Sequence, residues 1–262
     1  METKVISTEE ILEYLAELRL KHWGVKLKED LDEMNPKDRD AILPHLSRWL
    51  ITEKTERKTA QIACRVRSAK FRRLQTIETF NFKHNKITEK IERNYIELYN
   101  SIKRDDLPSA VFTGNAGTGK THLARSIGYG ACQKGLTVLF LTAAEMVNHL
   151  AHAQKISSLE QELNRYRRPQ VLIIDELGYV SLDTQASNLF FQVISARHDQ
   201  KLGTIATTNI PFGKFNQIFA NDAIAHAIVD RLVNDAEVFY MEGESYREHQ
   251  RQEKLKKRKT EN

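Results

Sequence analysis

GNAGTGKT, at residues 114–121, is the stretch that decides the fold of this chain. It follows the short apolar run AVF at 110–112 and precedes a stretch with the apolar spacing of an amphipathic helix. The pattern G-x-x-x-x-G-K-[ST] between a strand and a helix is typical of a phosphate-binding loop. Glycines let the backbone turn tightly and aim its N–H groups at an anion, and the next helix adds its positive N-terminal end. The alternative is a glycine-rich turn that only caps a helix, but the complete match in this context favours nucleotide binding.

Two side chains of this loop have separate expected tasks. Lys120 is expected to contact the β- and γ-phosphates of ATP and to assist catalysis, and the Thr121 hydroxyl is expected to ligate Mg²⁺. The expected nucleotide contacts are Gly114, Asn115, Ala116, Gly117, Thr118, Gly119, Lys120, Thr121, His122 and Arg247.

An acidic pair follows a second apolar run, VLII, at 171–174. Asp175 and Glu176 would lie at the carboxyl edge of a parallel sheet, where open α/β folds bind ligands. Asp175 is expected to hold Mg²⁺ through a water, and Glu176 to polarise the water that attacks ATP. Acidic pairs after strands are common in loops, and the upstream phosphate loop is what favours a functional interpretation.

Two further residues complete the expected catalytic set. Asn209 ends the apolar run 204–209 and is expected to orient the lytic water or touch the γ-phosphate, although Asn-Ile-Pro is also a turn sequence. Arg231, near the end of the helical stretch 222–232, is expected to reach the γ-phosphate of a neighbouring subunit. An arginine that complements the C-terminal end of its own helix remains the alternative, and Arg247 has the same ambiguity.

The order of apolar patterns predicts the architecture. Five short apolar runs alternate with helical stretches after residue 108, which predicts an α/β fold with a parallel five-stranded sheet covered on both faces. From residue 11 to about 73 the spacing is helical, in two segments separated by Asn35-Pro36. We expect a helical N-terminal domain with a basic neck at 1–75, an ATPase domain at 76–249 and a basic tail at 250–262.

Composition places the chain among globular proteins. Hydrophobic residues make up 40% and charged residues 29%, and no apolar run approaches the ~18 residues of a membrane helix. We therefore expect a cytoplasmic protein without membrane partners. The two cysteines lack metal-ligand spacing. The net charge of +5 is uneven, because residues 54–73 hold eight Lys or Arg against one acid, and 250–262 hold six against two.

The ordered motifs resemble those of the IstB-like helper ATPases of insertion sequences, relatives of the DnaC helicase loader in the AAA+ superfamily. The resemblance covers about residues 60–250 and rests on GNAGTGKTHLA, LTAAEMVNHL, VLIIDELGYVSLD, TTNIPF, AIVDRL and GESYR. It implies an AAA+ domain with strand order 5-1-4-3-2, without the C-terminal helical lid of other AAA+ proteins. It makes Asp175 and Glu176 the Walker B pair, Asn209 sensor 1 and Arg231 the arginine finger. The first fifty residues match the family only in helical character.

The resemblance also implies DNA as a partner of the basic segments. Cations spaced along a helix would contact successive phosphates in a salt-dependent, sequence-neutral way, whereas a solvated helix face is the alternative. A second group lies between the second strand and the acidic strand, where initiator-type AAA+ proteins carry an inserted helix that faces DNA. The expected DNA contacts are Arg65, Arg67, Lys70, Arg72, Arg73, Lys155, Arg165, Arg167 and Arg168.

Three functions are consistent with these residues. The first is a Mg²⁺-dependent ATPase that forms a homo-oligomer on duplex DNA with ATP and recruits or stimulates the transposase of its element. The second is a replicative-helicase loader, which an adjacent replication gene instead of an adjacent transposase gene would indicate. The third is an ATP-gated DNA scaffold in which hydrolysis is only a timer, and a Glu176→Gln variant separates it from the first.

Overall fold

The computed structural model describes residues 5–246 and divides the chain into two compact units, with the change between Cys64 and Arg65. The sequence analysis places this boundary after residue 75. Arg247, the basic tail at 250–262 and the expected absence of a C-terminal lid concern residues outside the described range.

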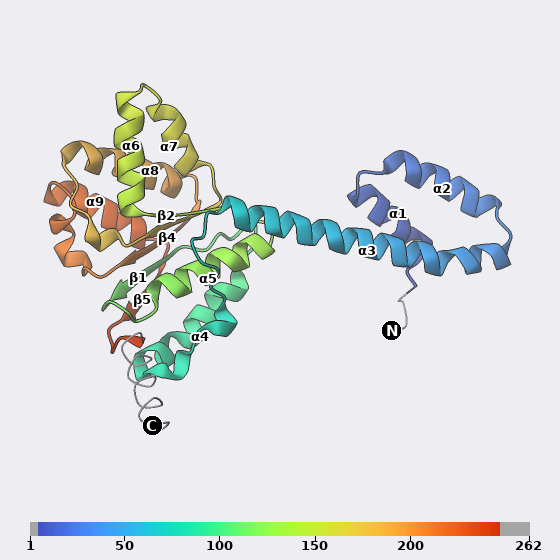
Figure 1. Cartoon of the computed structure of the whole chain (residues 1–262), viewed down its shortest axis with the longest axis horizontal. Helices are drawn as coiled ribbons and strands as arrows, with labels where there is room; N and C mark the ends of the chain where they lie inside the picture. Colours follow the sequence, from blue (N-terminus) through green and yellow to red (C-terminus); the bar gives the residue numbers. More distant parts are fainter. Residues whose placement is uncertain (1–4, 247–262) are drawn as a thin grey trace, which may run out of the picture. The chain divides into compact units, whose positions relative to one another are not determined.

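The first unit is helical, as its apolar spacing predicts. It contains α1 (Thr8–Glu17), α2 (Lys21–Glu33) and most of α3 (Pro36–Ser68), which continues into the second unit (Figure 1). Pro36 begins α3, a position where its missing N–H has no helical partner to lose. The core of this unit consists of Ile6, Ile11, Leu15, Leu18, Leu46 and Leu50. Trp49, although it shares the helical spacing of this core, is 57% exposed.

The second unit is built on a five-stranded, all-parallel sheet. Its strands are β1 (Ala110–Gly114), β2 (Val138–Thr142), β3 (Val171–Asp175), β4 (Gly203–Thr208) and β5 (Glu237–Met241). They lie in the order β2-β3-β4-β1-β5 among the described residues, so the strand order implied by the family resemblance is confirmed. Every residue of β2 and β3 is buried, which explains why these strands read as continuous apolar runs in the sequence.

Alternate strand residues face two separate hydrophobic cores. Leu172 and Ile174 belong to the core under α6 (Ala143–Lys155), α7 (Leu159–Arg167), α8 (Thr184–Asp199) and α9 (Asp222–Val233). Ile173 belongs to the core under α4 (Lys86–Ser101) and α5 (Lys120–Gln133). Figure 1 shows these two groups of helices on opposite faces of the sheet. The predicted three-layer α/β fold is therefore confirmed.

The segment between α3 and α4, residues 69–85, packs against the second unit, and we call it the connector. The carbonyl oxygen of Ala69, which is buried, accepts a hydrogen bond of 2.8 Å from the N–H of Phe140 in β2. The Phe71 ring lies 5.9 Å from the Phe140 ring. Short 3₁₀ turns at Ile77–Thr79 and Phe82–His84 follow, and Asn85 caps α4. The connector therefore runs along the α5 side of the sheet toward its carboxyl edge.

A buried arginine links the segment before β3 to the start of β4. Arg197 of α8 is fully buried, and burial lowers its pKa to about 9. Its guanidinium donates hydrogen bonds of 2.5–3.4 Å to the carbonyl oxygens of Tyr166, Pro169, Gln170 and Gly203 and to the hydroxyl of Thr204. These acceptors lie in the segments before β3 and at the start of β4, so one side chain holds both.

Among residues 5–246, none of the helices has the length and apolar character needed to cross a membrane.

Candidate functional site

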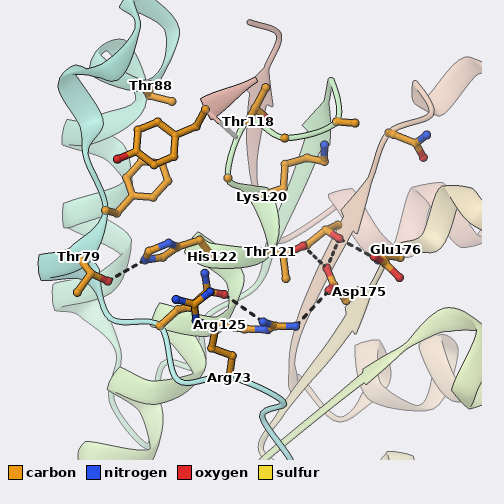
Figure 2. Close-up of a pocket in the computed structure, with 18 of the residues that line it drawn as sticks. Arg73, Thr79, Thr88, Thr118, Lys120, Thr121, His122, Arg125, Asp175 and Glu176 are labelled. Atoms are coloured by element: carbon orange, nitrogen blue, oxygen red, sulfur yellow. Dashed lines mark hydrogen bonds and ion pairs between the residues drawn. The ribbon is translucent and has the colours of Figure 1, made fainter. Parts of the chain in front are cut away.

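A pocket of about 560 Å³ opens at the carboxyl edge of the sheet (Figure 2). Its walls come from the loop after β1, the ends of β3 and β4, and the connector. The lining includes residues 116–122, Arg125, Asp175, Glu176, Tyr179, Thr207, Thr208, Asn209 and Tyr246, with Arg73, Gln75, Thr79, Phe80 and His84 from the connector. Segments more than a hundred residues apart thus converge where parallel α/β sheets bind their ligands.

The loop between β1 and α5 adopts a backbone with a positive φ at three glycines, Gly114, Gly117 and Gly119. Gly114 has φ 137°, and a Cβ there would collide with the backbone carbonyl of Met241 in the neighbouring strand. Gly119 has φ 101° and directly precedes α5. A left-handed residue at this point starts the helix at Lys120 and turns the first N–H groups of α5 toward the pocket. This backbone is the arrangement that the sequence pattern predicts for phosphate binding.

The side chain of Lys120 folds back over the loop that precedes α5. Its ammonium donates hydrogen bonds of 2.7 Å to the carbonyl oxygen of Gly114 and 2.6 Å to that of Asn115. The positive charge is therefore held at the loop, on the wall of the pocket. The expected contact of Lys120 with phosphate groups stays a prediction.

Asp175 is the polar centre of the pocket floor. It is buried at the end of β3, and its Oδ1 accepts hydrogen bonds from the hydroxyls of Thr121 (2.8 Å) and Thr207 (2.6 Å). The Thr207 hydroxyl in turn accepts from the N–H of Glu176 at 3.0 Å. Sequence reasoning missed Thr207. Its place one strand away, two residues before Asn209, is the signal that could have found it.

Glu176 is exposed at the pocket and has a left-handed backbone, with φ 61°. A non-glycine residue in this conformation is strained by about 1 kcal/mol or more, and such strain clusters at functional sites. The conformation turns the chain sharply after β3, so that Asp175 is buried while Glu176 projects from the sheet edge.

The oxygens at the pocket floor suit a magnesium ion carried by a nucleotide. Mg²⁺ in phosphate-binding sites is usually held by one or two protein oxygens together with substrate phosphates and waters. The Thr121 hydroxyl and the Asp175 carboxylate, 2.8 Å apart, provide such a donor pair. Within residues 5–246 there is no group of three or more His, Cys, Asp or Glu side chains placed to hold a metal by themselves.

Arg125, which sequence reasoning missed, lies beside Asp175. Its Nη2 is 3.9 Å from Asp175 Oδ2, and its Nη1 donates to Gln75 Oε1 at 3.1 Å. Burial lowers the pKa of Arg125, and the nearby Arg72 and Arg73 lower it further, while Asp175 opposes the shift. Because residues four apart share a helix face, its position relative to Thr121 is a signal present in the sequence.

His122 joins α5 to the connector. Its Nε2 lies 2.9 Å from the carbonyl oxygen of Thr76 and 3.2 Å from the Thr79 hydroxyl. The His122 ring meets Phe80 edge to face, with centroids 5.2 Å apart. Burial is the main cause that lowers the pKa of His122. The structure thus places His122 on the pocket wall with its imidazole turned to the connector.

Asn209 follows β4 and lines the pocket, as expected. Its Oδ1 is buried and has no hydrogen-bond partner within the described part of the chain. Gly178 lies directly against it, since a Cβ at that position would collide with the Asn209 oxygen. A buried polar atom without a partner is rare in proteins, and a water or a ligand is one of its ordinary explanations.

Arg231 is not among the residues that line the pocket of its own chain. Its Nε donates to the Ser195 hydroxyl at 3.2 Å, its Nη1 donates to the Ala227 carbonyl at 3.2 Å, and its guanidinium lies 4.8 Å from the Phe191 ring centroid. The structure therefore does not bring Arg231 together with Asp175 and Lys120 within one chain.

The segment that leads to Arg247 rests on the phosphate loop. The N–H of Tyr246 donates to the Gly117 carbonyl at 3.0 Å, and Asn115 Nδ2 donates to the Gly243 carbonyl at 3.4 Å. Tyr246 also meets His84 edge to face, with centroids 4.6 Å apart. Tyr246 is thus a pocket residue that sequence reasoning missed.

The expected DNA contacts do not form one helical stripe. α3 ends at Ser68, and Lys70 has a left-handed backbone with φ 62°, so the expectation of cations spaced along one helix is wrong beyond Ser68. Arg72 pairs with Glu145 at 2.7 Å and Arg73 lines the pocket. Arg67 and Lys70 are exposed, and Arg65 is half-buried.

The second group of expected DNA contacts lies on and around α6 and α7. Lys155 and Arg168 are exposed. Arg165 pairs with Glu162 at 2.8 Å, and Arg167 pairs with Glu160 at 3.1 Å. Two of these four cations are therefore already paired within the chain.

Comparisons with known proteins agree with this geometry. Residues 14–254 match the family described as IstB-like ATP binding protein. The putative ATP-binding protein of insertion sequence IS5376 from Geobacillus stearothermophilus is 37% identical over 202 residues, which cover 77% of this chain and 79% of the relative. The putative ATP-binding protein of IS21 from Pseudomonas aeruginosa is 29% identical over 89% of this chain and 86% of its own.

Solved structures share the fold over about two thirds of this chain. The crystal structure of DnaI has a TM-score of 0.56 at 18% identity and covers 65% of this chain and 89% of its own. The crystal structure of the DnaC helicase loader has a TM-score of 0.56 at 19% identity and covers 63% of this chain and 96% of its own. At these identities the likeness concerns the fold.

Proposed function

The chain belongs to the IstB-like ATP-binding protein family, and from this membership we propose that it is an ATP-dependent, DNA-binding regulator of transposition. It forms a homo-oligomer on duplex DNA with ATP in the cytoplasm, and it recruits or stimulates the transposase of its own element. The observation that carries the proposal is the convergence of Lys120, Thr121, Asp175, Glu176 and Asn209 on one pocket behind a glycine-turned phosphate loop. The relatives named as insertion-sequence proteins favour this function over helicase loading.

The residues of the pocket supply the parts that ATP hydrolysis needs. The N–H groups at the start of α5 and the Lys120 ammonium bind the phosphates. Thr121 and Asp175 would hold Mg²⁺, which would supply charge neutralisation for the phosphates. Glu176 accepts a proton from the attacking water, and Asn209 orients that water through its buried Oδ1. ADP and phosphate are the products.

In an oligomer, Arg231 of one subunit acts at the nucleotide pocket of the next. Because Arg231 is not among the residues that line the pocket of its own chain, its guanidinium is left to serve the γ-phosphate of a neighbouring subunit. Its contacts with Ser195 and Phe191 set its direction.

Arg231→Ala is expected to reduce hydrolysis by about 10³-fold or more, because transition-state charge on the γ-phosphate loses its partner. Mixing Arg231→Ala subunits with Lys120→Ala subunits is expected to restore part of the rate, since some interfaces then combine an intact loop with an intact arginine. The rate of the mixture is compared with that of each variant alone. Absence of any recovery, with both variants folded and assembled, counts against action between subunits.

The exposed cations at the end of α3 are the proposed start of the DNA contact. Arg67→Gln/Lys70→Gln is expected to lower the salt dependence of log K for duplex DNA by about 2, because two phosphate contacts are lost. Both side chains lie outside the nucleotide pocket, so ATP affinity is expected to stay constant. Binding is measured against salt concentration with and without ATP.

A matched control removes the same charge elsewhere. Lys90 and Arg93 are exposed on α4, and Lys90→Gln/Arg93→Gln is expected to leave the salt slope unchanged. If the two double variants lower the salt dependence of DNA binding equally, net charge alone explains the effect. That result would contradict a DNA contact at Arg67 and Lys70.

The experiment that tests the whole function measures the ATPase rate with and without duplex DNA while the assembly state is followed in parallel. DNA is expected to raise the rate and ATP to raise the oligomer size. ATP-dependent and DNA-dependent retention of the transposase encoded beside this gene then tests the partner. An ATPase rate and an oligomer size that do not change when DNA is added would refute the proposal.

A further inference from the structure

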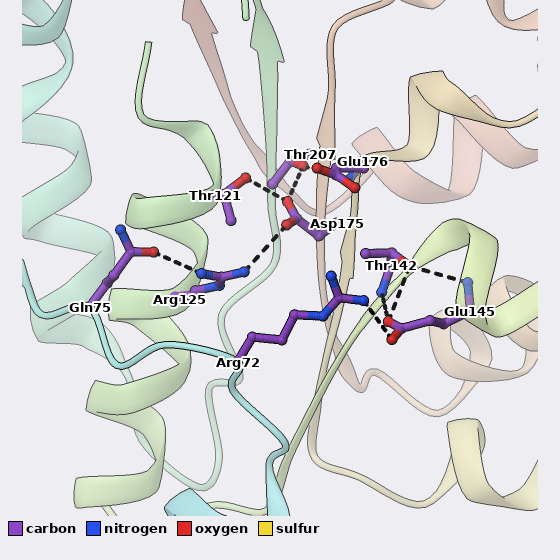
Figure 3. Close-up of polar contacts among 9 residues, drawn as sticks. All are labelled: Arg72, Gln75, Thr121, Arg125, Thr142, Glu145, Asp175, Glu176 and Thr207. Carbon is purple, nitrogen blue, oxygen red and sulfur yellow. Dashed lines mark hydrogen bonds and ion pairs between the residues drawn. The ribbon is translucent and has the colours of Figure 1, made fainter. Parts of the chain in front are cut away.

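The buried carboxylate of Asp175 has a cation on the side that the threonine hydroxyls leave open (Figure 3). Oδ1 accepts from Thr121 and Thr207, whereas Oδ2 faces Arg125 Nη2 at 3.9 Å. The Asp175 side chain is 3% exposed and that of Arg125 is 13% exposed. The two charges therefore face each other largely out of solvent.

The position of Arg125 is set by groups other than Asp175. A separation of 3.9 Å is too long for a hydrogen bond, so the carboxylate attracts the guanidinium without fixing its geometry. Gln75 Oε1 accepts from Nη1 at 3.1 Å, and the guanidinium lies 4.6 Å from the Phe140 ring centroid. Gln75 and Phe140 thus hold the cation beside Asp175.

This arrangement gives Asp175 charge compensation that does not depend on a metal. An ionised carboxylate buried without a nearby cation is strongly destabilising, and removing one partner of a buried pair leaves that cost exposed. A magnesium ion at the same carboxylate would supply the same compensation, and its charge would be repelled by the neighbouring guanidinium. Arg125 and Mg²⁺ are therefore alternatives for one negative charge.

We propose that Arg125 is the charge-compensating residue of Asp175, that it competes with Mg²⁺ for this carboxylate, and that Gln75 fixes it in the competing position. The inference rests on the proposed function, because it takes the pocket to bind a magnesium nucleotide. It assigns Arg125, which lies four residues after the end of the G-x-x-x-x-G-K-[ST] pattern, a positioning role beside the expected metal site.

The competition also involves the connector. Gln75 belongs to it, and Arg72 of the same segment pairs with Glu145 at 2.7 Å, next to the end of β2. Glu145 Oε2 also accepts from the N–H of Thr142 at 2.8 Å. The connector is thus tied to α5 through Gln75 and to the start of α6 through Arg72, on both sides of Asp175 (Figure 3), and the hold of Gln75 on Arg125 depends on that placement.

The test measures the melting temperature of the full chain in EDTA, and then with a slowly hydrolysed ATP analogue as Mg²⁺ is titrated. The Mg²⁺ midpoint is the concentration that gives half of the rise in melting temperature. Arg125→Met is expected to melt lower than wild type in EDTA, because Asp175 loses its compensation. Its Mg²⁺ midpoint is expected to fall by about tenfold, because the competing charge is gone.

Three further variants separate this effect from a packing defect. Arg125→Lys keeps the charge and is expected to keep the midpoint within about threefold of wild type. Gln75→Leu loosens the guanidinium and is expected to shift the midpoint in the direction of Arg125→Met by a smaller factor, with no added shift in the double variant. Arg93→Met removes an exposed arginine of α4 and is expected to change neither quantity.

An Arg125→Met midpoint equal to or above that of wild type would overturn the proposal. If Arg125→Met does not fold, Arg125→Gln and Gln75→Leu test the same proposal. Arg125→Gln removes the competing charge, and Gln75→Leu removes the side chain that holds it in place. If the magnesium nucleotide does not change the melting temperature of the wild-type chain, the proposed function itself is refuted. A normal wild-type response with unshifted variants refutes only the role of Arg125.

Discussion

Lys120→Ala is expected to weaken ATP binding by about 100-fold or more and to abolish ATP-dependent retention of DNA. The substitution removes an ammonium that would make charge-assisted hydrogen bonds to phosphate. It also removes the hydrogen bonds that this ammonium donates to the Gly114 and Asn115 carbonyls, so the loop loses internal support. ATP affinity is measured with a fluorescent analogue, and DNA binding is measured with and without ATP.

The matched control for Lys120 lies at the other end of the same helix. Lys134 follows α5 and donates to the carbonyl oxygens of Tyr99 and Asn100, outside the pocket. Lys134→Ala is expected to keep both ATP affinity and ATP-dependent DNA binding. Equal ATP affinity for wild type and Lys120→Ala would contradict the assignment of residues 114–121 as the phosphate site.

Glu176→Gln is expected to slow hydrolysis by about 10²- to 10⁴-fold while ATP binding and assembly on DNA persist. The amide cannot accept the proton of the attacking water, and general-base catalysis has about this magnitude. Because Glu176 is exposed and its backbone N–H makes the contact with Thr207, the substitution leaves the hydrogen bonds of Asp175 in place. Single-turnover hydrolysis and DNA-bound oligomer size are the measurements.

The same variant decides whether hydrolysis is essential to function. Glu89→Gln, at an exposed position of α4, is the control for loss of one carboxylate. If Glu176→Gln supports a full round of target selection, hydrolysis acts only as a timer and the chain is an ATP-gated scaffold. If its hydrolysis rate equals that of wild type, Glu176 is not the general base.

The strands and the loop were predictable because their signals are local. β3 appears in the sequence as four apolar residues followed by two acids, and residues 114–121 contain their glycines at the positions where the backbone needs them. Strand order came from the family resemblance. These features depend on residues that are neighbours in the chain, which is why a single sequence reveals them.

The missed parts of the site depend on contacts between distant segments. Thr207 reaches Asp175 from another strand, and Gln75 reaches Arg125 across 50 residues. The end of α3 was missed for a related reason, because charge spacing alone does not report that Ala69 is buried and that Lys70 turns left-handed. Tertiary packing determines these positions, and the spacing of apolar residues along the sequence carries no information about such packing.

The buried Arg197 couples the two strands that carry the catalytic edge. Its guanidinium is satisfied by carbonyl groups from the segment before β3 and from the start of β4, so this desolvated cation loses acceptors if either segment moves away. The positions of Asp175 at the end of β3 and of Asn209 after β4 therefore depend in part on one side chain at the opposite edge of the sheet.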